Sequence, residues 1–318
     1  MLATPHDIFF KALFSHPRRA AEVLRAVLPS QVARRIDWST LVHVRGSFID
    51  DKLRNSHADL LFSAVMAGRT IKIYVLFEHQ STYDPTMGRR LLRYMDRIWD
   101  VVAEPGASEL PVIIPVVLYH GEKPWSGTTD FHGMFTLPPE CAPFVPQFRF
   151  VLVDLAALDP AVIHAWTASA CVRLALLVLQ SARSPTRLDE VLLGLRNLIL
   201  RVMAEPFEDG ALRQIIRYIL ETRGAEEFDR AVDLMTDIEK DQAGGTMETI
   251  AQMLRREGRV EGRVEGRRNT LLEVIQLRHG EVPATLRAQI ETANEAELQM
   301  WLARVVRSST LVELLTPG

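Results

Sequence analysis

The stretch HADLLFSAVMAGRTIKIYVLFEHQS, residues 57–81, decides the fold that the sequence predicts. Two apolar runs, His57–Met66 and Thr70–His79, flank the residues Ala-Gly-Arg-Thr, which are typical of a tight turn. Each run has the length and the content of aliphatic and aromatic residues that strands prefer. The stretch therefore predicts a β-hairpin.

Carboxylates occur in this hairpin where a buried strand should have none. Asp59 lies near the start of the first strand, and Glu78 lies near the end of the second. Gln80 follows Glu78 by two residues, so the two side chains should point to the same face of the strand. A carboxylate on each arm can hold a divalent metal ion, but a salt-bridged or solvent-facing sheet edge explains the same residues. The spacing leaves both interpretations open.

The residues before the hairpin predict helices and one more strand. Residues 5–28 have helical periodicity and form one amphipathic helix, or two short ones broken near Pro17, with Thr4 as the cap. Leu41–Ile49 is a predicted strand. Three strands in succession with short connections indicate an antiparallel meander.

The residues after the hairpin predict an arginine-bearing helix and further strands. Thr86–Val102 has an apolar stripe, and a neighbouring face carries arginines three or four residues apart: Arg89, Arg90, Arg93 and Arg97. Ordinary solvation and contact with phosphate both explain such arginines. Pro111–Tyr119 reads as a strand covered on both faces, whose two prolines favour a sheet edge or a bulge. Phe148–Asp154 is a further short strand, after an irregular segment over 121–146.

The second half of the chain is predicted to be helical. Residues 161–241 indicate a bundle or cap, with helices predicted over 161–181, 186–203, 209–223 and 225–240. Two or three short helices are expected in 279–315. Met247–Leu277 reads as one long helix containing REGRVEGRVEGRR, in which Gly258, Gly262 and Gly266 form one ridge. That helix is either an exposed linker or a surface for self-association. The predicted divisions are 1–158, 159–243, 244–278 and 279–318.

Composition excludes several classes of protein. The chain has 318 residues, 47% hydrophobic and 24% charged, which indicates a soluble globular protein, and its net charge of −3 means that nucleic-acid binding would need a local basic face. Two cysteines, Cys141 and Cys171, cannot form a disulfide framework or a four-thiolate zinc site. Neither a phosphate-binding glycine loop nor a serine-nucleophile motif stands out. The N-terminus does not read as a signal peptide and the apolar run 168–180 is too short to span a bilayer, so a cytoplasmic protein is expected.

Four segments resemble a known family. TPHDIFFKALFSHP (4–17), HADLLFSA (57–64), IYVLFEHQS (73–81) and RRLLRYMDRIWD (89–100) are similar to the recombination-promoting nucleases, also described as transposases, within the PD-(D/E)XK nuclease superfamily. The resemblance implies a restriction-endonuclease-like αβββαβ core of the α/β class, followed by an all-helical region. It also implies a DNA endonuclease that depends on Mg²⁺, or on Ca²⁺ or Mn²⁺, and acts in recombination or in mobile elements.

The resemblance also assigns roles to the hairpin residues. Asp59 matches the first motif carboxylate and Glu78 the second, and both would bind the metal. Gln80 stands where the superfamily has a lysine, which puts activation of the attacking water in doubt because glutamine carries no charge. The alternative is a weak or inactive DNA-binding accessory protein that self-associates through its C-terminal helices. In either case Arg89, Arg90 and Arg93 are the expected phosphate contacts.

Overall fold

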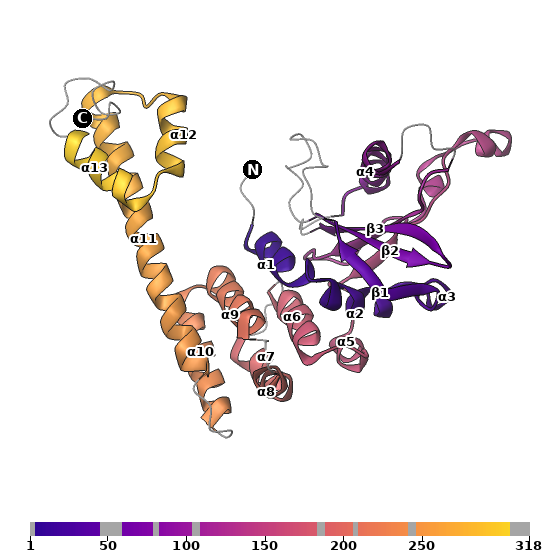
Figure 1. Ribbon diagram of the computed structural model, residues 1–318, viewed down its shortest axis with the longest axis horizontal. Coiled ribbons are helices and arrows are strands. Elements are labelled where there is room, and N and C mark those ends of the chain that lie inside the picture. The colour runs from indigo at the N-terminus through magenta and orange to yellow at the C-terminus, as the bar shows by residue number, and fades with distance from the viewer. Residues whose placement is uncertain are drawn as a thin grey trace. The chain divides into compact units, whose positions relative to one another are not determined.

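The computed structural model describes residues 4–44, 59–78, 83–103, 109–182, 188–205, 209–240 and 246–305 of the chain. Contacts divide the protein into two compact units, Met1–Met247 and Glu248–Gly318 (Figure 1). The finer division into four parts stays a prediction.

A mixed five-stranded sheet is the centre of the first unit. The described strands lie in the order β1-β2-β3-β4-β5; β1, β2 and β3 are antiparallel neighbours, and β3, β4 and β5 run parallel. Their bounds are Ile36–His43, Asp59–Met66, Arg69–Glu78, Ile113–Tyr119 and Val151–Asp154. The sheet confirms the α/β class and the antiparallel meander.

The predicted hairpin is confirmed, with a tighter turn than the sequence indicated. Met66 pairs with Arg69, so only Ala67 and Gly68 form the loop. Both have positive φ, 51° and 78°. A two-residue loop with two positive φ angles has a twist that matches the twist of the flanking strands. Glycine adopts a positive φ without strain, whereas Ala67 at the first position adopts it although its Cβ makes this region less favourable.

Two strand predictions need correction. The first strand begins at Ile36 rather than Leu41, because its register shifts between Asp37 and Val42 and this breaks the alternation of apolar and polar residues. The edge position predicted for the proline-bearing strand is also wrong, since β4 lies between β3 and β5 in regular register. The β4–β5 ladder starts at Val116, one residue after Pro115, so the missing donor at Pro115 leaves that ladder intact.

Helices cover both faces of the sheet. On one face α4 (Met87–Val102) packs residues such as Leu91 and Ile98 against Leu61, Val117 and Tyr119. On the other face α1 (Pro5–Phe14) and α2 (Pro17–Val27) pack against alternate residues of the same strands, among them Leu60, Phe62 and Leu118. Figure 1 shows α4 and α2 on opposite sides of the sheet. The two helices before the sheet confirm the predicted break near Pro17.

The start of α1 is fixed by a reciprocal cap. The hydroxyl of Thr4 accepts from the backbone N–H of Asp7, and the Asp7 carboxylate accepts from the backbone N–H of Thr4 at 3.0 Å. Asp7 is fully buried. Its carboxylate thus has a capping role in α1.

A helical layer completes the first unit. Phe9 of α1 stacks on Tyr218 at a centroid distance of 4.2 Å, which joins this layer to the helices on the sheet. The prediction of continuous helix over 161–181 and 186–203 is wrong in detail, since each stretch forms two helices. The described helices are α5 (Pro160–Ala165), α6 (Ala170–Ser181), α7 (Leu188–Gly194), α8 (Arg196–Ala204), α9 (Asp209–Arg223) and α10 (Ala225–Lys240). Short turns of helix occur at α3 (Ser30–Ala33), η1 (His132–Met134) and η2 (Pro139–Phe144).

The second unit is built on one long helix. The predicted helix is confirmed as α11 (Thr246–His279), followed by α12 (Ala284–Thr292) and α13 (Glu295–Val305). Leu271 and Ile275 of α11 are fully buried against residues such as Leu298. Glu295 of α13 accepts from Arg263 at 2.9 Å and from Arg267 at 2.7 Å. The C-terminal half of α11 therefore belongs to the core of the second unit.

Candidate active site

The candidate site lies at the edge of the sheet where four strands begin or end. Because β3, β4 and β5 are parallel, their carboxyl ends, at Glu78, Tyr119 and Asp154, meet at one edge. β2 is antiparallel to β3, so its first residue, Asp59, lies at the same edge. Ligand sites in sheets with parallel strands commonly form at this edge.

The register places the two candidate carboxylate residues on the same face. Asp59 pairs with Leu76, and Glu78 lies two residues farther along β3. Positions two apart on a strand share a face, so Asp59 and Glu78 are diagonal neighbours, with Cα atoms about 7–8 Å apart. Glu78 also pairs with Tyr119, which packs in the cluster beneath α4. Both positions thus belong to the face that α4 covers, whereas Gln80 lies outside the described residues.

Aromatic side chains form the wall next to these strand ends. Tyr119 is fully buried and meets Trp125 edge to face at 5.2 Å, and Trp125 meets Tyr83 in the same way at 4.9 Å. A Cβ at Gly127 would lie 2.1 Å from the Tyr83 ring, so this close approach requires glycine. Tyr83 lies just before α4 in the chain, four residues ahead of Met87. The cluster therefore ties the start of that helix to the ends of β4 and β5.

Asp154, although it ends β5 in the same row, has a structural role. Its carboxylate accepts from the backbone N–H groups of Trp125 at 2.7 Å, Ala156 at 2.9 Å and Ala157 at 3.2 Å. These bonds fix the loops that follow β4 and β5. A carboxylate engaged by three donors holds its place without a metal ion.

The arginines of α4 have unequal environments. Arg89 and Arg93 are exposed, whereas Arg90 is mostly buried and donates to Asp84 at 2.9 Å. Asp84 also accepts from the backbone N–H and the hydroxyl of Thr86, both at 2.7 Å. Burial acts to raise the pKa of Asp84, but its bonds to Thr86 and Arg90 leave that pKa below its ordinary value. Arg90 therefore anchors the start of α4, and Arg89 and Arg93 present their charge to solvent.

The Asp84–Arg90 pair was not among the residues predicted from the sequence. The signal was present as Asp-Pro-Thr at 84–86 just before the helix, since an aspartate there commonly bonds to the backbone two residues on. This local pattern does not show that Arg90, six residues after Asp84, is the ion-pair partner.

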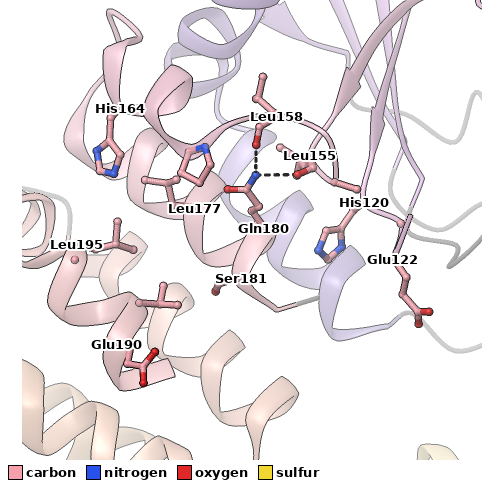
Figure 2. Close-up of a pocket in the computed structure, with 15 residues that line it drawn as sticks. His120, Glu122, Leu155, Leu158, His164, Leu177, Gln180, Ser181, Glu190 and Leu195 are labelled. Atoms are coloured by element: carbon pink, nitrogen blue, oxygen red, sulfur yellow. Dashed lines mark hydrogen bonds between the residues drawn. The ribbon is translucent and has the colours of Figure 1, made fainter. Parts of the chain in front are cut away.

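A pocket of about 530 Å³ lies beside the ends of β4 and β5 (Figure 2). Gln180 of α6 donates to the main-chain carbonyls of Leu155 and Leu158, at 2.9 and 2.5 Å, and holds the segment after β5. His120 is buried and its Nε2 lies 2.7 Å from the carbonyl oxygen of Leu179, so that nitrogen carries the proton. The lining includes none of the residues that the sequence singled out for catalysis. It adjoins the same sheet edge as the carboxylate positions without including them.

The carboxylate positions fit a hard divalent cation by their chemistry and their placement. Magnesium binds one or two carboxylates together with water and phosphate oxygens, and Asp59 and Glu78 supply two such groups from neighbouring strands. Elsewhere, the side chains that the structure describes include no cluster of three or more His, Cys, Asp or Glu suited to a metal ion.

Comparisons with known proteins found a matching family model and several relatives. A family model described as "Putative transposase, YhgA-like" matches residues 4–206. The chain is 30% identical over 260 residues to "Recombination-promoting nuclease RpnA" of Escherichia coli K12, which covers 80% of this chain and 85% of that protein. It is 29% identical to "Recombination-promoting nuclease RpnC" of the same strain, over 80% of this chain and 82% of that protein.

A further relative is described differently. "Inactive recombination-promoting nuclease-like protein RpnE", also from Escherichia coli K12, is 28% identical over 80% of this chain and 83% of that protein. No solved structure matches the chain. In the part of the chain that the structure describes, no helix has the length and apolar character needed to cross a membrane.

Proposed function

Because the chain belongs to the family of YhgA-like transposases, with recombination-promoting nucleases among its relatives, we propose that it is a metal-dependent DNA endonuclease that hydrolyses phosphodiester bonds. Its role would lie in DNA recombination or in mobile elements. The observation that carries the proposal is the β2–β3 register, which puts Asp59 and Glu78 on one face at one sheet edge.

The proposal includes a PD-(D/E)XK, restriction-endonuclease-like core. Its support is the order of elements, in which helices precede three strands, a helix and a further strand. Asp59 and Glu78 stand at the positions where that core would carry its two motif carboxylates. The sheet edge is where such a core would hold the scissile phosphate.

Asp59 and Glu78 would hold the divalent ion, Mg²⁺ or alternatively Mn²⁺ or Ca²⁺. When bound, such an ion lowers the pKa of a coordinated water and polarises the phosphoryl group. Gln80 can hydrogen-bond the phosphate or orient the water through its amide, but it supplies no positive charge. Arg89 and Arg93 would contact neighbouring phosphates, and Arg90, bound to Asp84, would position their helix.

Isosteric substitutions of the two carboxylates test this function. With Mg²⁺ or Mn²⁺, the wild-type protein should nick or cut plasmid DNA, and Asp59→Asn and Glu78→Gln should each lower the rate at least about 100-fold. The measurement is plasmid relaxation on a gel, with thermal melting to check the fold. Glu109→Gln is the control, since that exposed carboxylate pairs with the exposed Arg69 and the variant should keep full activity. Full cleavage by both site variants would remove the two carboxylates from the mechanism.

A second candidate is a DNA-binding recombination protein with little or no turnover. The observations that favour it are Gln80 at the lysine position and a relative described as inactive. In that case DNA would bind with strong salt dependence, and none of the three cations would support cleavage. This candidate is excluded if the wild-type protein cleaves DNA and the Glu78→Gln variant does not.

The proposed function includes self-association through the long helix around residues 247–277. Gly258, Gly262 and Gly266 lie on one ridge of α11, and a Cβ added at any of them would meet no atom within 4 Å. The ridge thus leaves room for a second helix to approach closely. The mass of the protein in solution tests this partner.

A further inference from the structure

A second positively charged surface lies on α2 and α3, on the opposite face of the sheet from α4. Residues 17–35 carry five arginines and one glutamate, a net charge of +4, in a chain whose total charge is −3. A local concentration of positive charge on a negatively charged protein is the electrostatic signature of a polyanion site.

The helix α2 presents part of this charge on one stripe. Arg18 and Arg25 are seven residues apart, which places them on the same face, and both are exposed. Ala20 and Leu24 on the opposite side are buried. Glu22 lies between the two arginines, but its carboxylate accepts from the backbone N–H of Ser169 at 2.8 Å. The one acidic residue of the segment thus contributes to the cap of α6.

Trp38 connects α2 with the residues after α3. The guanidinium of Arg25 lies over the Trp38 ring, 5.2 Å from its centroid, and the indole N–H donates to the carbonyl of Ala33 at 2.9 Å. Arg25 therefore lies beside the end of α3, where Arg34 and Arg35 follow. Stacking on an aromatic ring holds the planar guanidinium in place before any ligand arrives.

The four exposed arginines of this surface have no carboxylate partner among the residues that the structure describes. Arg34 donates to the carbonyl and the hydroxyl of Ser30, at 3.1 and 3.2 Å, and Arg18 and Arg35 extend from the surface. Among the described residues, no acidic side chain forms an ion pair with Arg18, Arg25, Arg34 or Arg35. Exposed arginines elsewhere do form such pairs, as Arg149 does with Asp130.

We propose that these four residues, the α2–α3 arginine face, bind the phosphate backbone of duplex DNA as a site separate from the strand ends. Arg18 and Arg25 are about 10 Å apart along α2, which matches the rise of three phosphates of one strand, about 3.4 Å each along the DNA axis. Guanidinium groups bind phosphate oxygens through two parallel hydrogen bonds. The face would hold flanking DNA while the strand-end site engages the bond to be cut.

An acidic protein fits this face less well than DNA does. Tight protein interfaces are centred on large apolar or aromatic side chains that become buried on binding. In residues 17–35 the large apolar side chains are all buried or half-buried. The identification of the polyanion as DNA rests on the proposed function, whereas the existence of an anion-binding face does not.

Two variants of the full-length chain with equal net charge test the proposal. One changes Arg18, Arg25, Arg34 and Arg35 to Gln, and the control changes to Gln four arginines outside this face that already have carboxylate partners: Arg69, Arg149, Arg217 and Arg230. Affinity for a 30-base-pair duplex is measured in EDTA, so cleavage plays no part. At about 100 mM salt the face variant should lose at least about tenfold in affinity, and its slope of log K against log salt should fall by about 3 to 4. The control should change less than about threefold.

Equal losses in both variants would show an effect of net charge alone and overturn the proposal. Unchanged DNA affinity in the face variant would also overturn the proposal. This is the result expected if the partner of the face is an acidic protein. If the fourfold variant melts early, the pair Arg18→Gln and Arg35→Gln replaces it, because neither side chain is bonded within the described chain, and the slope should fall by about 2. Four Arg→Lys changes keep the charge and should keep the slope. Binding with this pattern but without cleavage in Mg²⁺ would reject only the nuclease function.

Discussion

α4 and α11 both carry rows of arginine, but the structure fixes them in different ways. In α4 an apolar stripe that includes Leu91 and Ile98 is buried on the sheet along the length of the helix. In α11 the buried residues of the core, Leu271 and Ile275, come after the glycine repeat, and the three glycines face open space. The spacing of arginines alone therefore does not determine where a charged face lies.

The consequence is functional as well as structural. Because α4 is held by the sheet, Arg89 and Arg93 keep a defined place on the exposed side of this helix. In the first half of α11 Leu254 is buried, but the glycines of the repeat face open space. That ridge leaves room for a second helix to pack against it.

The largest expected effect comes from removing the apolar contacts that hold each helix. Leu91→Ala and Ile275→Ala each empty a fully buried position and should cost about 3 kcal/mol of unfolding free energy. Hydrogen exchange in urea, followed peptide by peptide, separates the units. Leu91→Ala should expose the sheet, and Ile275→Ala only residues of the second unit. Val101→Ala, at an exposed position of α4, is the control and should cost little.

Exposure of both units by either substitution would mean that the two regions unfold together. The contrast between α4 and α11 would then hold for local packing only.

A smaller effect of opposite sign is expected from the glycine ridge. Changing Gly258, Gly262 and Gly266 together to Ala should stabilise α11 by about 2 kcal/mol, because alanine favours the helix and each Cβ has room. If the ridge is the self-association surface, the same variant should have a lower mass by light scattering, since the added methyl groups keep two helices apart. Lower stability with unchanged mass would contradict both expectations.

The smallest effect concerns the ion pair that anchors α4. Asp84→Asn should cost about 1 kcal/mol at pH 7, since it weakens the bonds to Arg90 and Thr86. The folded-state pKa of Asp84 is lowered, so its stabilisation is present above the ordinary pKa, near 3.8, and is lost as the pH falls through the folded value. Urea unfolding of both proteins between pH 7 and 3 should therefore show the difference shrinking only below about pH 4. If the difference in unfolding free energy between the two proteins stays constant down to pH 3, the effect comes from packing and not from the charge of Asp84.

The sequence predicted most elements whose periodicity is local and uninterrupted. The hairpin, α4, α9, α10 and α11 lie close to their predicted ranges. Errors came where a long-range contact overrides the local pattern: the register shift in β1 hides its alternation, and β4 occupies the sheet interior despite Pro115. The break between α5 and α6 was also missed, although Ser169 caps α6 there.

The hairpin, its carboxylates and the rows of arginine can be read from the sequence, because alternation and helical spacing are properties of neighbouring residues. Which of these residues lie close together depends on the tertiary structure. Strand pairing brought Asp59 and Glu78 to one face of one edge, and Trp38 joined Arg25 to the arginines after α3. Such contacts depend on register and packing between segments far apart in the chain, which local spacing does not specify.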